Sequence, residues 1–209
     1  TGGTVRFRNA AGEAIGDVSF PAQCAAGYWT DSSVTVKVPA KFTTPADTPV
    51  ALNPPYDVTV VRSDGRSSNA RPFVIDTAPV PPGICRIDPD NGPAGSAVTL
   101  YGENFGDIAA NDLPSFSALH PDAVSFHDHK PASSIGQWGS SGIKAVVPDG
   151  ALTGPAVIKT YSGSAALASN GINFRVSDCR QAGGDAACGN GRACCGDGSC
   201  RASCGGSSA

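Results

Sequence analysis

The chain has 209 residues, a net charge of −3, 26 glycines, 17 prolines and only 16% charged residues. So many helix breakers exclude long helices, and the absence of a basic excess argues against a nucleic-acid partner. No stretch of the sequence approaches the roughly 18 apolar residues of a membrane-spanning helix. The chain starts at Thr1 and contains no methionine, so we expect that a signal peptide has been removed.

Four short segments alternate apolar and polar side chains, as half-buried strands do. They are residues 4–8, 33–38, 56–60 and 97–101. Asn-Gly and Asp-Gly pairs, which supply the positive φ angles of tight turns, lie along the chain between such segments. They occur at residues 64–65, 91–92, 149–150 and 170–171. Short strands with regular turn signals predict an all-β sandwich or barrel.

The sequence around Trp29 is repeated around Trp138. Residues 29–39 match residues 138–148 at a constant offset of 109, and both copies end in Val-Pro. Two further pairs of segments match, residues 5–7 with 124–126 and residues 68–75 with 169–176. The chain therefore holds two copies of one β unit, and the first copy carries an extra loop within residues 40–55.

Residues 84–106 carry a motif with no counterpart in the first copy. It reads Ile-x-x-Ile-x-Pro-x-x-Gly-Pro-x-Gly-x-x-Val-Thr-Leu-x-Gly-x-Asn-Phe-Gly. This string resembles the opening of an IPT/TIG domain, a family found in bacterial surface proteins, plexin-type receptors and some transcription factors. The resemblance implies tandem immunoglobulin-like β-sandwiches. The motif residues to which we assign architectural roles are Gly92, Pro93, Gly95, Gly102, Asn104, Phe105 and Gly106.

The predicted organisation has four parts. They are an IPT/TIG-like β-sandwich lacking its first strands at 1–77, a proline-rich linker at 78–83, a complete IPT/TIG sandwich at 84–178 and a cysteine-rich tail at 179–209. A sandwich without its first strands leaves backbone groups and core side chains uncovered. Two explanations stay open, a boundary or cut within a longer chain, or complementation by strands of another chain.

All eight cysteines are expected to form disulfides, which places the protein in an oxidising compartment outside the cytoplasm. They are Cys24, Cys85, Cys179, Cys188, Cys194, Cys195, Cys200 and Cys204. A zinc cluster is the rival interpretation, but the tail has no histidine and its gaps do not fit paired C-x₂-C knuckles. We expect an intramolecular bond between Cys24 and Cys85, with an intermolecular bond as the alternative.

The six tail cysteines, with an adjacent pair in the middle, resemble a knottin. That resemblance implies bonds between Cys179 and Cys195, Cys188 and Cys200, and Cys194 and Cys204. From the residues alone, six cysteines allow fifteen pairings and the sequence does not choose among them. We interpret the tail as a compact stapled cap, with a small binding module as the alternative.

The sequence contains no G-x-S-x-G elbow, H-E-x-x-H motif, P-loop or G-x-G-x-x-G loop. His127 and His129 would form a metal pair if they shared one strand face, but a solvated strand end is the favoured interpretation. We therefore predict no catalytic residue, no metal and no cofactor, and we do not expect an enzyme.

Two other groups of residues have a chemical and an architectural interpretation. Asp88, Asp90 and Asn91 offer the oxygen ligands that Ca²⁺ prefers, but they lie in the turn of the motif, so we favour a turn. Trp29 and Trp138 recur at matching strand positions, which indicates core residues rather than platforms for sugar rings.

These observations predict a non-catalytic structural or adhesion protein that is extracellular or at the cell surface. We expect a subunit of a surface fibre or sheath that assembles by strand-edge complementation, with other copies or other surface proteins as partners. An accessory module that binds polysaccharide, or a fragment of a larger secreted protein, is the alternative. An aromatic content of 7% argues mildly against the carbohydrate module.

Overall fold

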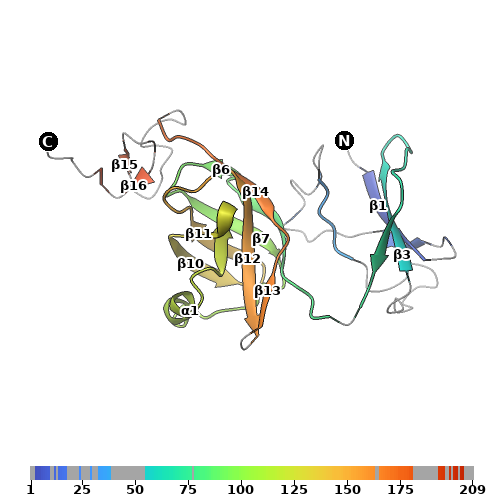
Figure 1. Ribbon diagram of the computed structural model, residues 1–209, viewed down its shortest axis with the longest axis horizontal. Coiled ribbons are helices and arrows are strands. Elements are labelled where there is room, and N and C mark those ends of the chain that lie inside the picture. Colours follow the sequence, from blue (N-terminus) through green and yellow to red (C-terminus); the bar gives the residue numbers. More distant parts are fainter. Residues whose placement is uncertain are drawn as a thin grey trace. The chain divides into compact units, whose positions relative to one another are not determined.

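The computed structural model describes residues 3–9, 12, 14–17, 24, 29, 33–38, 55–76, 78–162, 165–180, 193–195, 198, 200–201 and 203–204. The chain divides into two compact units, Thr1–Pro79 and Val80–Ala209 (Figure 1). β-Strands make up most of the regular structure, in agreement with the predicted all-β class. Within these residues the one α-helix is α1 (Leu113–Leu119), and no helix has the length and apolar character needed to cross a membrane.

The first unit holds one four-stranded antiparallel sheet. In spatial order its strands are β2 (Ala14–Asp17), β1 (Gly3–Arg8), β3 (Pro55–Arg62) and β4 (Arg71–Val74). Side chains on β1 alternate between core and surface, so Val5 and Phe7 are buried together with Tyr56 of β3. Around these three lie partly buried side chains that include Trp29, Val34 and Val36.

The second unit contains two larger sheets. The first is ordered β10 (Ser134–Gly139), β11 (Gly142–Val146), β7 (Ala97–Glu103) and β5 (Gly83–Asp88). The second is ordered β6 (Asn91–Gly92), β14 (Ile172–Val176), β12 (Gly154–Ser162), β8 (Val124–Phe126) and β9 (Lys130–Pro131), with β13 (Ala165–Ala168) also on β12. A cysteine-bearing pair, β15 (Ala193–Cys194) and β16 (Cys200–Arg201), follows in the tail.

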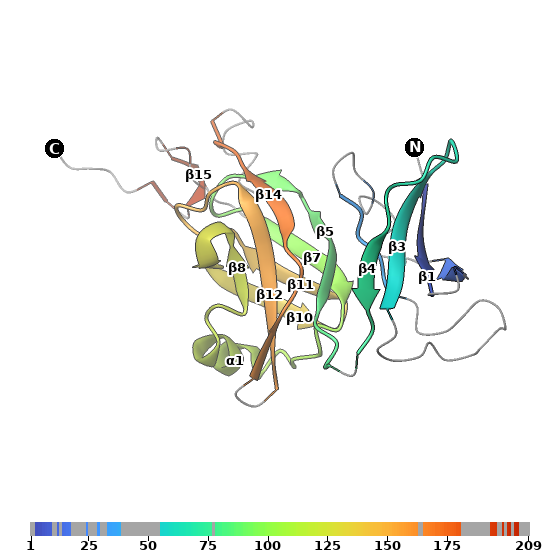
Figure 2. The ribbon, with the colours of Figure 1, turned by 45° about the vertical axis from the view of Figure 1, so that its right-hand side comes forward.

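One hydrophobic core joins the two sheets of the second unit. Val98 and Leu100 of β7 and Ile143 of β11 contribute from one sheet, and Ile158 of β12 and Phe174 of β14 contribute from the other. Figure 2 shows the strands of these sheets as two layers. The prediction that alternating residues of β7 enter the core is confirmed, because Val98 and Leu100 are 2% and 0% exposed.

Matching strand registers confirm the internal repeat. Trp29 forms an antiparallel bridge with Val34, as Trp138 pairs with Ile143. The other sheet repeats as well. The equivalent pairs are Val5 with Val60 and Val124 with Ile158, and Phe73 with Tyr56 and Phe174 with Gly154. The strands β2, β1, β3 and β4 thus have the order of β9, β8, β12 and β14. The longer connection predicted within residues 40–55 lies almost wholly outside the described residues.

Candidate functional site

One side of the first unit is less covered than the same side of the second. Val38 is 36% exposed, whereas Val147, its counterpart in the repeat, is fully buried. Val34 and Val36 are likewise only partly buried in the first unit. Apolar side chains that are fully buried in the second unit therefore have counterparts in the first that are partly buried, as at Val34 and Val36, or exposed, as at Val38.

The covering strands explain this difference. In the second unit β7 pairs with β11, which places Leu100 opposite Ile143 and Val98 opposite Ala145. Strand β5 then adds Ile84 beside β7. The described residues of the first unit contain no counterpart of β5 or β7, and none of them covers its valines in this way.

The outer edge of β4 shows the same difference. In the second unit β14 pairs with β12 on one side and with β6 on the other, through a parallel contact between Val176 and Gly92. In the described part of the first unit β4 pairs with β3 alone. An edge strand of this kind presents unpaired backbone groups, which another strand can bind. The candidate interaction surface, which we call the open side, comprises Val34, Val36, Val38 and the outer edge of β4.

Equivalent serines fix the hairpin next to this strand edge in both units. The backbone N–H of Ser68 donates to the Val60 carbonyl at 2.9 Å, and the Ser68 hydroxyl accepts from the Val60 N–H at 3.0 Å. Ser169 makes the same two contacts with Ile158 at 2.8 and 2.9 Å. The residue that follows each serine is therefore held at an equivalent place.

A polar cluster in the second unit, formed by Asp122, Lys159 and Tyr161, is not predicted by the sequence. Lys159 donates to one carboxylate oxygen of Asp122 and the Tyr161 hydroxyl donates to the other at 2.7 Å. The Lys159 ammonium holds the pKa of Asp122 below its ordinary value. Burial, reinforced by the Asp122 carboxylate, raises the pKa of Tyr161 to about 12. No local motif predicts this cluster, because Asp122 lies on a different segment from its two partners.

Aromatic rings surround Tyr161. The His120 ring stacks on it with centroids 3.7 Å apart, and Phe116 of α1 contacts both rings. Phe116 also meets the buried Trp138 edge-on, and the Trp138 indole N–H donates to the Phe105 carbonyl at 2.9 Å. Trp138 is thus a core residue, as predicted, while Phe116, His120 and Tyr161 remain partly exposed.

The two histidines considered as a metal pair lie outside the strands. His127 and His129 are exposed, but they belong to the 3₁₀ turn η2 (His127–His129) and not to a strand, so the shared strand face is wrong. Asp128 and His129 adopt positive φ angles of 60° and 57°, which no strand contains. Across the described part of the chain no group of three or more His, Cys, Asp or Glu side chains is arranged to hold a metal.

The acidic residues of the motif take part in local bonds. Asp88 pairs with Arg86, and the Asp90 carboxylate accepts from the Asn91 amide at 2.7 Å. The Asp90 carbonyl also accepts from the Arg175 N–H at 3.0 Å. Asn91 itself belongs to β6, so part of the predicted turn is a short parallel strand contact with β14.

The motif glycines occupy crowded or left-handed positions. A Cβ on Gly102 would lie 1.9 Å from the Gly83 carbonyl oxygen, so this site excludes a side chain. Gly95 and Gly106 have φ angles of 85° and 71°. Asn104 shares this left-handed geometry with φ 62°. The remaining motif residues Gly92, Pro93 and Phe105 are buried, with Phe105 only 2% exposed.

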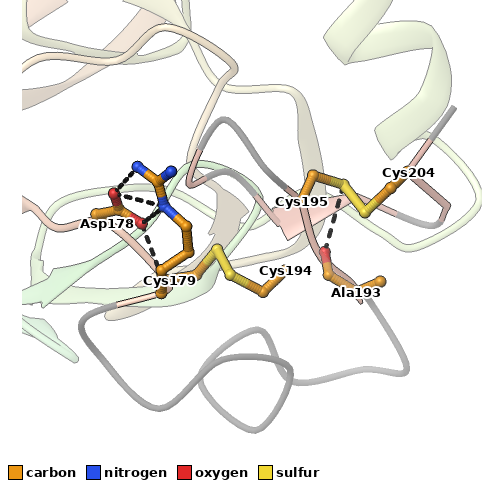
Figure 3. The surroundings of a disulfide bond; sticks show 7 residues. Asp178, Cys179, Ala193, Cys194, Cys195 and Cys204 are labelled. Carbon is orange, nitrogen blue, oxygen red and sulfur yellow. Dashed lines mark hydrogen bonds and ion pairs between the residues drawn. A yellow bond between two sulfur atoms is a disulfide. The ribbon is translucent and has the colours of Figure 1, made fainter. Parts of the chain in front are cut away.

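The tail contains disulfides, but not in the knottin arrangement. Cys179 is bonded to Cys194, and Cys195 is bonded to Cys204 (Figure 3). The pairings of Cys179 with Cys195 and of Cys194 with Cys204 are therefore wrong. In the β15–β16 ladder the backbone of Cys194 lies opposite that of Cys200, and the adjacent Cys194 and Cys195 form disulfides with different partners.

For the remaining cysteines the disulfide partners, including the bond between Cys24 and Cys85, stay a prediction. Cys24, Cys85 and Cys200 are disulfide-bonded. Cys188 lies outside the described residues. Among the cysteines that the structure describes, none is free.

One backbone hydrogen bond joins the tail to the β-sandwich part of the second unit, and other contacts lie within the tail or at its start. The Cys200 N–H donates to the Ala94 carbonyl at 2.8 Å, and the Cys179 N–H donates to the Gly198 carbonyl at 3.0 Å. Arg180 pairs with Asp178 through two nitrogens, and this contact lowers the pKa of the Asp178 carboxyl (Figure 3). The Cys200 bond therefore places β16 beside Ala94.

The protein is all-β and disulfide-bonded, and comparisons with known proteins assign it to no family. No family model matches the chain, and no similar curated protein is found. Among solved structures, the gamma-CGTase from alkalophilic Bacillus clarkii is similar over 57% of this chain and 17% of that chain, with 21% identity and a TM-score of 0.34. A likeness of this size defines neither a fold family nor an activity.

Proposed function

We propose that this is a non-catalytic structural or adhesion protein outside the cell, whose first unit is completed by strands from a neighbouring molecule. Both units would then follow the immunoglobulin-like plan of IPT/TIG domains. The observation that carries the proposal is the open side, where Val38 is 36% exposed and its counterpart Val147 is fully buried. Covering such valines with a donated strand removes apolar surface from water and pairs the edge of β4.

Disulfides support the proposed location. Bonds such as Cys179–Cys194 and Cys195–Cys204 persist in oxidising surroundings and are rare in the cytoplasm. A braced tail beside a β unit suits a protein that must remain folded on a surface.

Light scattering combined with electron microscopy tests the proposal on the protein under native, non-reducing conditions. We expect defined oligomers or filaments, and we expect Val36→Asp to abolish them, because a charge on the open side opposes apolar docking. Lys144→Asp, an exposed position on β11 of the second unit, is the control and leaves assembly intact. A wild-type protein that stays monomeric at all concentrations contradicts the proposal.

An accessory carbohydrate-binding module is the second candidate. The partly exposed rings of Phe116, His120 and Tyr161, beside Asp122 and Lys159, combine aromatic surface with hydrogen-bonding groups. Sugar rings bind to such combinations, although His120 already covers one face of Tyr161. Specific binding on a glycan array that Tyr161→Ala removes would favour this candidate over the structural role.

A further inference from the structure

Asn69 and Asn170 hold equivalent positions, but within the described part of the chain only Asn170 binds a strand. Ser68 and Ser169 each donate from the hydroxyl to the carbonyl of the following asparagine, at 2.8 and 2.7 Å. The two hairpins therefore hold the backbone of these asparagines through the same contacts. Asn69 is exposed, and its side chain has no hydrogen-bond partner within the described residues.

The Asn170 amide clamps strand β5. Its oxygen accepts from the Ile84 N–H at 2.8 Å, and its nitrogen donates to the Ile84 carbonyl at 2.8 Å. One side chain thus satisfies both backbone groups of a single residue, as a neighbouring strand would do. The Ile84 side chain meanwhile enters the core and is fully buried.

We infer that Asn69 is the recognition residue for the donated strand, an inference that rests on the proposed function. Its amide bonds the backbone N–H and C=O of one residue of the incoming strand, as Asn170 bonds Ile84. Recognition through the backbone aligns the strand in one register and leaves its side chains free to fill the core.

The second unit also defines the chemistry of the partner. The clamped residue carries a buried apolar side chain like Ile84, and a second apolar residue follows at the position of Ile87. A following strand of the β7 type then covers Val34 and Val36, as Leu100 and Val98 cover their counterparts. The partner is therefore a β-hairpin with alternating apolar residues and a non-proline residue at the clamped position, because the clamp needs an N–H.

A peptide-binding experiment tests the inference on the complete chain. The probe is a fluorescent synthetic peptide with the sequence of residues 83–105 carrying Cys85→Ser, and binding is followed by fluorescence anisotropy. We expect saturable binding that Asn69→Ala weakens about tenfold to thirtyfold, since two neutral hydrogen bonds are lost. The affinity of Asn69→Asp for the probe should lie between those of the wild type and Asn69→Ala, because a carboxylate accepts from the N–H but cannot donate to the carbonyl.

Two control variants separate the inference from the proposed function. Asn173→Ala, at an exposed asparagine of β14, should bind the probe as the wild type does. Val36→Asp should abolish binding, which places the probe on the open side.

Equal binding by Asn69→Ala and the wild type, with loss in Val36→Asp, overturns the role of Asn69 and leaves complementation standing. Absence of binding to the wild type, or full binding to Val36→Asp, overturns complementation by this class of hairpin. Protection of the Asn69 side-chain amide from hydrogen exchange on probe binding would give independent support.

Discussion

The ring of Phe7 meets the ring of Phe73 edge-on, with centroids 5.5 Å apart and an interplanar angle of 72°. Phe126 and Phe174 repeat this contact in the second unit at 5.5 Å and 73°. Each unit thus has the same aromatic contact, between β1 and β4 in the first unit and between β8 and β14 in the second. Edge-to-face pairs of this kind add stabilisation beyond that of simple burial. The first unit thus repeats this part of the core, whereas its described residues include no counterpart of the covering strands β5 and β7.

The unequal burial of Val38 and Val147 predicts that equivalent substitutions at these two positions lower the free energy of unfolding by different amounts. Val147→Ala should lower the free energy of unfolding of the second unit by about 2 kcal/mol, through lost methyl burial and a residual cavity. Val38→Ala should cost about 0.5 kcal/mol or less, because this side chain is 36% exposed. Chemical denaturation followed by fluorescence measures each unit separately, with Trp29→Phe isolating Trp138 and Trp138→Phe isolating Trp29. Equal costs at the two positions would show that Val38 is covered as completely as Val147.

The Asn170 clamp supplies a second prediction. Asn170→Ala should destabilise the second unit by about 2–3 kcal/mol, because the N–H and carbonyl of Ile84 both lose their partner in a part-buried setting. Asn173→Ala is the matched control and should change stability by less than about 0.5 kcal/mol. Urea denaturation monitored at Trp138 gives both values. A cost for Asn170→Ala as small as that of the control would mean that water replaces the clamp.

The sequence identified the repeat because strand periodicity and the Trp and Val-Pro positions are local features. Burial of Val98, Leu100 and Phe105 followed from the same alternation and turn chemistry. Helix α1 carried no such signal, because its seven residues are too few to show a helical period and tertiary packing of Phe116 holds it.

The candidate sites depended on contacts that a sequence does not display. Asp122 meets Lys159 and Tyr161 only after β12 is in place. The disulfide partners of Cys194 and Cys195 are the reverse of those in the knottin pairing. His129 failed as a strand residue because its backbone turns left-handed. In each case tertiary geometry decided among arrangements that the residue pattern allowed.

Tyr161 should ionise late in an alkaline titration. Its pKa in the folded protein is about 12, above the ordinary value of about 10, because burial and the Asp122 carboxylate disfavour the phenolate. The stabilisation linked to this raised pKa is complete below pH of about 10 and is lost as the pH rises toward 12. Difference absorbance at 295 nm between wild type and Tyr161→Phe isolates this residue. Asp122→Asn should lower the pKa of Tyr161 only part of the way toward its ordinary value, since the burial of Tyr161 remains. A Tyr161 titration centred near 10 would contradict the part-buried hydrogen bond between Tyr161 and Asp122.

Disulfide mapping tests the tail arrangement directly. Digestion after arginine under non-reducing conditions should link residues 176–180, which contain Cys179, to residues 193–201. The knottin pairing predicts the same linked peptides, so the decisive step is fragmentation between Cys194 and Cys195. We expect the Cys179 fragment on Cys194 and the Cys204 fragment on Cys195. Cys195→Ser with Cys204→Ser should preserve the Cys179–Cys194 link, because the two bonds are separate. The reverse assignment would restore the knottin pairing.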